Sequence, residues 1–318
     1  MNEQIATTIN KINKVFIPHD KVVNAISKLE KSLLLSQAAQ NQKDDTLTSF
    51  VPDNILLLGE AGTGKTTVCS AIIQKYPAKV MVDEGFETTI VPSFYTQVPS
   101  PITIKGVASS VLKSLGAHDH DKGSIPSMTK KIDTLLRTCK TDLMMLDEFH
   151  HLLNDRTDAA KVRNWIKALI NESKVPIVLV GEPGCEALID SDLQLKRRFP
   201  VRINLDKLDF YSNGGAGEFI HFSQSVSVAI TKVCKLVSFP KMNTEKELYP
   251  LYVATGGYPS SMLTLLKEAV YLALKRGENS VSMEDISQAY DSVTLAHSLV
   301  SKGNPFQMKL SELIKSIK

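Results

Sequence analysis

The sequence predicts an α/β fold, with a parallel sheet flanked by helices and a smaller helical domain after it. Three observations lead to this prediction. An apolar run opens into a glycine-rich loop and a helix at residues 54–67, and a second apolar run at residues 142–148 ends in paired acids. From about residue 208 the pattern changes to helices with short loops. The alternation of strands and helices favours a parallel sheet, and the run of helices after residue 208 favours a separate domain.

The composition sets limits on the kind of protein this is. With 318 residues the chain can form a core domain and a smaller one. Its 37 basic and 34 acidic residues give a net charge of +3, which does not by itself demand nucleic acid but allows a local basic surface. The four cysteines are far apart, which is typical of reduced thiols in a cytoplasmic protein. No leader and no membrane span is expected.

Before the first strand, Phe16, Ile17 and His19 lead into a helix that is expected to begin near Asp20. Two interpretations fit these residues. They form an apolar staple that fixes the start of the helix, or they belong to an N-terminal segment that lies over a bound adenine.

The glycine-rich loop has the spacing of a phosphate-binding loop. From Gly59 to Thr66 it fits G-x-x-x-x-G-K-[ST]. Its glycines let backbone N–H groups converge on phosphate oxygens. Lys65 would neutralise phosphate charge, and the Thr66 hydroxyl would ligate Mg²⁺. The alternative, a glycine-rich turn without a ligand, is disfavoured by the order of strand, loop and helix. The expected nucleotide-binding residues are Gly59, Glu60, Ala61, Gly62, Thr63, Gly64, Lys65, Thr66 and Thr67.

The region between the loop and the paired acids is less informative. Residues 79–83 and 88–95 are rich in β-forming residues, which predicts either paired strands or one strand with an excursion. His118 and His120 alternate with carboxylates, but no further ligand has a matching spacing. A solvated loop is therefore favoured there over a metal site.

The paired acids follow the apolar run LMML. A buried parallel strand meets the nucleotide at its carboxyl end. Asp147 is therefore expected to hold Mg²⁺, and Glu148 to act as the general base for the attacking water. His150 and His151 either make contacts in the following helix or communicate the state of the site. After the next buried strand, Glu182 is the residue available to position the water.

A third signal lies at Arg197 and Arg198, which precede Phe199 and a strand at residues 201–205. A guanidinium in this position suits delivery across a subunit interface to the γ-phosphate of a neighbour. Arg198 is favoured because it adjoins the apolar anchor. The alternative is the solvated basic end of a helix.

Taken together, GEAGTGKTT, LMMLDEFHH, the Gly181 turn, KRRF and the helical region resemble the AAA+ ATPases over nearly the whole chain. LDEFHH, the segment VFIPHDKVVNAISKLE and the small lid are similar to the TniB/TnsC family of transposition regulators. The resemblance implies a core with a five-stranded parallel sheet, which binds ATP and Mg²⁺. It also implies a ring or filament of this chain on double-stranded DNA. That assembly would link a TniQ-type target selector, RNA-guided in some relatives, to a transposase.

The resemblance divides the chain into four parts. It implies an N-terminal segment and linker helix at residues 1–48, an ATPase core at 49–207, a helical lid at 208–300 and a tail at 301–318. The tail places Leu310, Leu313, Ile314 and Ile317 on one helical face, which suits either a docking helix for a partner or packing on the lid.

The sequence departs from the family pattern in the lid. Many AAA+ lids carry an arginine three residues after a glycine, but here Gly257 is followed by Tyr258, Pro259 and Ser260. This departure implies slow, regulatory hydrolysis. The family's DNA contacts come from the inner surface of the ring. The candidates in the matching region are Lys105, Lys113, Lys122, Lys130 and Lys131.

Two other functions stay open. One is a replication initiator or helicase loader, although the residues after the last lid helix are too few for a winged helix. The other is a scaffold that binds ATP and DNA with little turnover.

Overall fold

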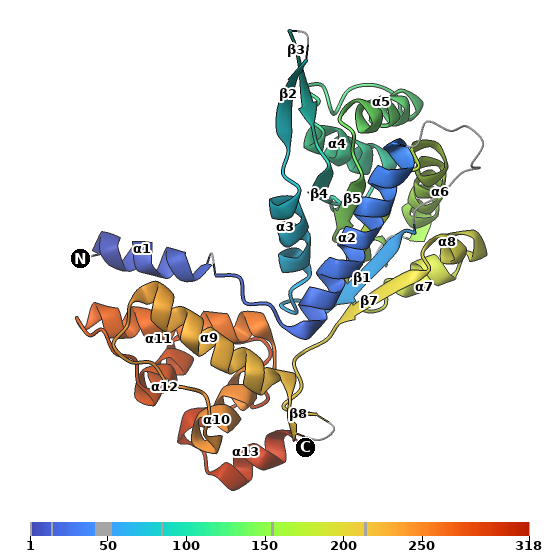
Figure 1. The fold of residues 1–318 in the computed structure, drawn as a ribbon. Helices are drawn as coiled ribbons and strands as arrows, with labels where there is room; N and C mark the ends of the chain where they lie inside the picture. Colours follow the sequence, from blue (N-terminus) through green and yellow to red (C-terminus); the bar gives the residue numbers. More distant parts are fainter. Residues whose placement is uncertain are drawn as a thin grey trace. The chain divides into compact units, whose positions relative to one another are not determined.

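The computed structural model describes residues 2–13, 15–41, 53–83, 85–153, 156–212 and 215–317 (Figure 1). The chain divides into two compact units. The sheet unit comprises residues 21–61 and 65–205, and the helical unit comprises residues 1–20, 62–64 and 206–318. The boundary predicted at residue 48 lies outside the described residues.

The sheet unit is built on five parallel strands, which confirms the predicted fold class. In spatial order they are β4 (Ser93–Gln97), β5 (Leu143–Asp147), β6 (Ile177–Gly181), β1 (Ile55–Gly59) and β7 (Val201–Leu205). Every residue of β1, β5 and β6 is buried. Strands covered on both faces read as continuous apolar runs, which explains why these three were recognisable in the sequence.

Helices cover both faces of this sheet (Figure 1). The apolar core between the sheet and α2 (Asp20–Asn41) and α3 (Lys65–Lys75) includes Met145. The core on the other face, beneath α4 (Ile104–Ser114), α5 (Ile125–Thr138) and α6 (Arg156–Ser173), includes Met144. Neighbouring residues of β5 thus serve opposite cores, because side chains alternate along a strand.

Short elements follow two of the strands. The 3₁₀ turn η1 (Phe149–Leu153) comes after β5, and α7 (Glu186–Asp190) and α8 (Leu193–Arg198) come after β6.

A hairpin stands apart from the main sheet. β2 (Lys79–Asp83) pairs antiparallel with β3 (Phe86–Ile90), and Val80 lies opposite Thr89. The structure therefore decides between the two interpretations of this region: residues 79–83 and 86–90 pair, and residues 93–97 join the main sheet. Val80 and Val82 are 60% and 69% exposed, so this ribbon contributes little to the core.

The helical unit has its own apolar core. It is formed mainly by α9 (Glu218–Cys234), α10 (Glu245–Thr255), α11 (Pro259–Lys275) and α12 (Met283–Ser292). The small strands β8 (Tyr211–Ser212) and β9 (Gly215–Ala216) precede these helices and pair with each other. Ser282 and Asp285 cap the start of α12, and each side chain accepts from the other's backbone N–H.

Both ends of the chain contribute to this helical core. Ile12 of α1 (Asn2–Asn13) is 2% exposed within it. Leu313 of α13 (Leu310–Ile317), which follows the turn η2 (Pro305–Gln307), is 3% exposed. One face of the tail helix therefore packs on its own unit, and docking of a partner by its other face stays a prediction. In the described part of the chain, no helix combines the length and apolar character that a membrane crossing requires.

Candidate functional site

The predicted phosphate loop lies between β1 and α3. Gly62 and Gly64 have φ angles of +86° and +106°, in the region that side chains other than glycine rarely adopt. Helix α3 begins at Lys65 directly after the loop. The turn that the glycine spacing predicts is therefore formed, and it leads into a helix N-terminus, where unpaired N–H groups favour an anion.

The ammonium group of Lys65 lies close to the backbone of the loop. The Lys65 ammonium donates to the carbonyl oxygens of Gly59 at 2.6 Å and Glu60 at 3.0 Å. These neutral acceptors leave the positive charge uncompensated, so an anionic group gains from approaching it. Glu60, Ala61, Thr66 and Thr67 are exposed, whereas Thr63 is buried.

The metal-binding residues predicted from the sequence are linked by a tyrosine that sequence reasoning missed. Asp147, 2% exposed, ends β5 and accepts a hydrogen bond from the Tyr95 hydroxyl of the neighbouring strand β4. The nearby side chains of Thr66 and Gln97 partly oppose the effect of this contact on the pKa of the Tyr95 hydroxyl. Burial, together with the hydrogen bond and charge of Asp147, raises the pKa of Tyr95 far above its usual range. The hydroxyl therefore stays protonated and remains a donor to Asp147.

This arrangement fits a magnesium ion. Thr66 and Asp147 supply oxygen atoms, the ligands that Mg²⁺ prefers. Asp147 also accepts from the Glu148 N–H at 2.7 Å, so its two oxygens have separate hydrogen-bond donors that fix the carboxylate plane. A period-2 pattern places Tyr95 on a strand face but does not pair β4 with β5, so the sequence could not reveal this contact.

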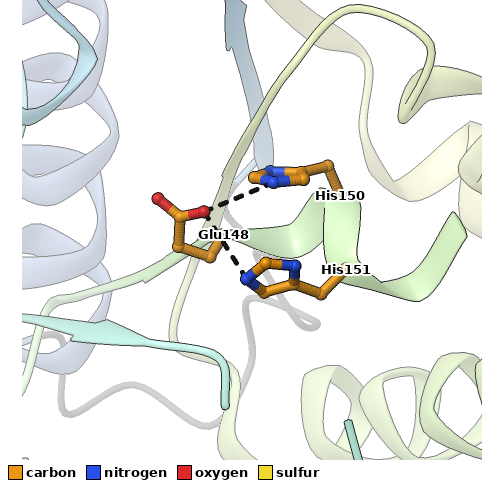
Figure 2. A group of neighbouring side chains, drawn as sticks. All are labelled: Glu148, His150 and His151. Carbon is orange, nitrogen blue, oxygen red and sulfur yellow. Dashed lines mark ion pairs between the residues drawn. The ribbon is translucent and has the colours of Figure 1, made fainter. Parts of the chain in front are cut away.

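Glu148 lies at a backbone position that is unusual for a residue with a side chain, with φ of +62°. Its carboxylate Oε2 lies 3.4 Å from His150 Nε2 and 3.7 Å from His151 Nε2 (Figure 2). The imidazole rings are tilted by 48° with their centroids 4.6 Å apart. The predicted general base thus has two histidine neighbours, and the role of these histidines stays a prediction.

Glu182 follows β6, the strand between β5 and β1, and is half-buried. Its carbonyl accepts from the Cys185 N–H at 3.2 Å, which begins the turn into α7. The role of its side chain in positioning water stays a prediction.

The two candidate arginines lie at the opposite edge of the sheet from the phosphate loop. Asn54, directly before β1, donates from Nδ2 to the Arg198 carbonyl at 2.9 Å, and its Oδ1 accepts from the Ile177 N–H at 2.8 Å. The five residues of β1 separate this point from the loop by about 16 Å. The Arg198 backbone therefore lies about a strand length from the chain's own phosphate loop, and a role of either arginine in trans stays a prediction.

The surroundings of these arginines are fixed by ion pairs. Arg202 binds Asp190 at 2.9 Å and 2.5 Å, and Lys167 binds Asp192 at 2.6 Å. The hydrogen bond and charge of Arg202 hold the pKa of Asp190 below its usual range. The Arg198 guanidinium donates to the Lys167 carbonyl at 3.2 Å, whereas Arg197 is exposed. A hydrogen bond thus links the end of α8 to α6, and Arg197 is the more accessible of the two arginines.

The N-terminal residues proposed for adenine belong to the helical unit. Ile17 packs against its core, the His19 ring meets Phe222 edge-on at 5.6 Å, and Phe16 is 47% exposed. These contacts test neither interpretation of the segment, so both the staple and an adenine contact stay predictions.

The candidate DNA-binding lysines differ in their surroundings. Lys105 and Lys113 on α4 and Lys130 on α5 are exposed, as is Lys122. Lys131 is half-buried and forms an ion pair with Asp119. In the loop between these helices, His120 Nδ1 lies 2.9 Å from the Ser109 hydroxyl. The histidines of this loop belong to no candidate metal cluster among the described residues.

The turn at Gly256 and Gly257 lacks the arginine of the family pattern and has an aromatic contact that the sequence did not predict. Gly256 and Gly257 have φ of +60° and +84°. Tyr258 stacks on His297 at 3.7 Å with 14° between the rings, and His297 Nδ1 lies 3.1 Å from the Ser261 hydroxyl. His297 comes from beyond α12, so no local pattern could have indicated it.

Comparisons with known proteins agree with this geometry. A family model described as Bacterial TniB protein matches residues 10–207. General secretion pathway protein A of Aeromonas hydrophila is 26% identical over 242 residues, which are 74% of this chain and 40% of that protein. This chain therefore spans about two fifths of the length of that relative.

Solved structures share the fold. The Orc1 protein of Aeropyrum pernix, solved in complex with DNA, matches with a TM-score of 0.57 at 18% identity, over 89% of this chain and 68% of that one. Cdc6p of Pyrobaculum aerophilum matches with a TM-score of 0.57 at 14% identity, over 90% and 71%. The RuvB Holliday junction branch migration motor of Thermotoga maritima matches with a TM-score of 0.50 at 16% identity, over 86% and 70%. The fold is that of the AAA+ P-loop ATPases, and the family match over residues 10–207 shows that the chain belongs to the TniB family.

Proposed function

We propose that this protein hydrolyses ATP at the carboxyl edge of its sheet. The observation that carries the proposal is the convergence at one edge of the sheet of the Lys65 loop, the Tyr95–Asp147 hydrogen bond and Glu148. Lys65 and the N-terminus of α3 bind the phosphates. Thr66 and Asp147 hold Mg²⁺, which when bound neutralises charge on the β- and γ-phosphates. Glu148 accepts the proton of the attacking water.

The site is completed by a second copy of the chain. Asn54 and Lys167 fix Arg198 at the amino edge of the sheet, about a strand length from its own phosphate loop. An arginine in that place cannot reach the nucleotide of its own subunit, but it can reach one bound to a neighbour in a ring or filament. Arg198 supplies the positive charge for the transition state, with Arg197 as the alternative donor.

The assembly acts in DNA transposition. Membership of the TniB family supports this role. The protein oligomerises with Mg²⁺ and ATP on double-stranded DNA, contacting phosphates through exposed lysines such as Lys105, Lys113 and Lys130. It links a TniQ-type target selector to the transposase, and hydrolysis controls how long the assembly lasts.

The test is electron microscopy of the purified protein with duplex DNA in ATP, ADP or a non-hydrolysable analogue, with steady-state ATPase measured in parallel. We expect ordered assemblies on DNA with ATP and the analogue but not with ADP. DNA of unrelated sequences should support assembly equally, and binding should weaken as salt rises. Monomers under all conditions would contradict the proposal.

The lid favours a second candidate, a scaffold that binds ATP and DNA with little turnover. Ser260 stands where many AAA+ lids have an arginine. The neighbouring Tyr258 ring is stacked on His297. Equal, near-background ATPase rates for the natural protein and Glu148→Gln, with and without DNA, would favour the scaffold. If the protein recruits a helicase and not a transposase to DNA, the function as a replication initiator or helicase loader would be favoured.

A further inference from the structure

We propose that Glu148, His150 and His151 form a binding site for a transition-metal cation of the Zn²⁺ type, and that this cation restrains hydrolysis by taking the Glu148 carboxylate as a ligand. The three ligand atoms lie within 4.8 Å of one another. The binding half of this inference stands on geometry alone. The regulatory half rests on the proposed role of Glu148 as general base.

The spacing of the donor atoms suits a tetrahedral centre. Bonds of about 2.0–2.1 Å to nitrogen and oxygen give ligand-to-ligand edges of about 3.3–3.4 Å in a tetrahedron. The edges from Glu148 Oε2 to His150 Nε2 and His151 Nε2 are 3.4 and 3.7 Å. Figure 2 shows both imidazoles directed at the same carboxylate oxygen.

The donor set distinguishes this cation from the one that accompanies ATP. Two imidazole nitrogens and one carboxylate oxygen suit zinc, whereas Mg²⁺ prefers oxygen ligands alone. Three protein ligands also leave the fourth tetrahedral position for water. Mg²⁺ bound by Thr66 and Asp147 therefore does not compete for the two histidines.

The backbone presents the three ligands together. The Phe149 side chain is 1% exposed, so it anchors the turn in the core. The His151 N–H donates to the Glu148 carbonyl at 3.0 Å, which closes the turn. The ligand side chains are 37%, 22% and 28% exposed for Glu148, His150 and His151, so a cation can enter from solvent.

The surroundings point to reversible binding. Metal-binding histidines usually donate from their second nitrogen to an acceptor, and loss of such a partner costs about 10- to 100-fold in affinity. His150 Nδ1 is buried and has no hydrogen-bond partner among the described residues. We therefore expect the affinity of a regulatory site rather than that of a structural zinc centre.

A bound cation would act on the general base directly. A carboxylate oxygen that donates its lone pair to the metal has less negative charge to accept a proton from water. It is also held against the two histidines and is less free to turn toward a water molecule. Release of the cation restores the base without any change in the phosphate loop.

The first experiment measures binding without nucleotide. The full chain, without a polyhistidine tag, is stripped with chelator, titrated with Co²⁺ and followed by visible absorption, and Zn²⁺ is then measured by equilibrium dialysis. We expect the absorption of a tetrahedral centre and one cation per chain. His150→Asn, His151→Asn and Glu148→Gln should each weaken binding at least tenfold. His118→Asn, in the loop between α4 and α5, is the matched control and should bind as the natural protein does.

The second experiment measures the ATPase rate of each variant with Mg²⁺ and Zn²⁺ together and divides it by the rate of the same variant with Mg²⁺ alone. This ratio should be well below one in the natural protein and in His118→Asn. In His151→Asn it should be much closer to one. Circular dichroism confirms that each variant is folded.

Equal cation affinity in all variants would overturn the site. Binding at the site with equal inhibition of His151→Asn would overturn the regulatory half. If no form of the protein hydrolyses ATP, the proposed function fails, while the binding experiment still decides the metal site.

Discussion

The two edges of the parallel sheet use polar residues in opposite ways. At the amino edge, Asn54 and Asp142 are nearly buried and are hydrogen-bonded to groups of neighbouring elements: Asn54 to Ile177 and Arg198, and Asp142 to Gln37. At the carboxyl edge, the Lys65 ammonium contacts the carbonyls of its own loop, and Glu148 contacts two half-buried imidazoles.

The difference shows that one edge of the sheet holds residues in position, whereas the other edge holds the residues that would act on a ligand. Partners at the amino edge are built into the fold, so they position the arginines and stay in place. At the carboxyl edge, Asp147 is fixed in the same way, but the partners of Lys65 and Glu148 are carbonyls of the loop and nearby imidazoles, which a phosphate, a cation or water can replace at small cost. The predictions that follow test this contrast, from the largest expected effect to the smallest.

Arg198→Ala should have the largest effect. If Arg198 acts on a neighbour's γ-phosphate, turnover should fall by about 10³-fold or more, while ATP affinity changes little. Steady-state ATPase and equilibrium nucleotide binding measure the two quantities. Arg197→Ala is the matched control and should cost far less.

Mixed assemblies make this test sharper. A subunit with Arg198→Ala keeps Glu148, and a subunit with Glu148→Gln keeps Arg198. Mixing the two inactive variants should therefore recover part of the activity at interfaces that combine both intact groups. Absence of any recovery, with mixed assemblies present, would rule out the trans role.

Glu148→Gln alone should lower turnover by about 10²- to 10⁴-fold, the usual contribution of a general base. The amide has the size of the carboxylate but cannot accept the proton. ATP binding and assembly on DNA should persist, which electron microscopy can confirm. Undiminished turnover would remove Glu148 from the chemistry.

Tyr95→Phe should act on the metal rather than on the water. The Tyr95 hydroxyl orients Asp147, and loss of such an outer partner typically costs about 10- to 100-fold in metal affinity. We expect the Mg²⁺ concentration for half-maximal ATPase to rise about tenfold. Tyr76→Phe removes a comparable hydroxyl contact, 2.6 Å to Glu30, and should leave the Mg²⁺ requirement unchanged. An equal Mg²⁺ requirement in both variants would contradict the role of Tyr95.

A substitution at the amino edge of the sheet should change the free energy of unfolding and not the ATPase rate. Burial raises the pKa of Asp142 to about 6, while its hydrogen bond from Gln37 opposes the rise. The folded protein therefore holds the proton up to about pH 6, whereas the unfolded chain releases it near pH 4. Folding stability from this group is present below about pH 4 and is lost as the pH rises to about 6.

Asp142→Asn should therefore stabilise the protein above pH 6, by at most about 3 kcal/mol. The amide cannot ionise, and its oxygen can still accept from Gln37. The gain should shrink toward zero near pH 4. Denaturant unfolding at pH 7.5 and pH 4 measures it, and a gain independent of pH would contradict the assigned cause. ATPase activity should be unaffected.

The sequence by itself determined the features that depend on neighbours along the chain. The continuous apolar runs at β1, β5 and β6 fix buried parallel strands, and the glycine spacing fixes the turn at Gly62 and Gly64. The cap at Ser282 and Asp285 is equally local. These patterns are readable because backbone sterics and solvent burial act within a few residues.

Only the tertiary structure decided which distant residues meet. Tyr95 reaches Asp147 because β4 and β5 pair in one register, and Arg198 lies at the amino edge because Asn54 binds its carbonyl. The choice between the interpretations of residues 79–95 likewise depended on strand pairing. Pairing and side-chain hydrogen bonds across 52 and 144 residues leave no periodic signal in one sequence, because they depend on where separate elements pack.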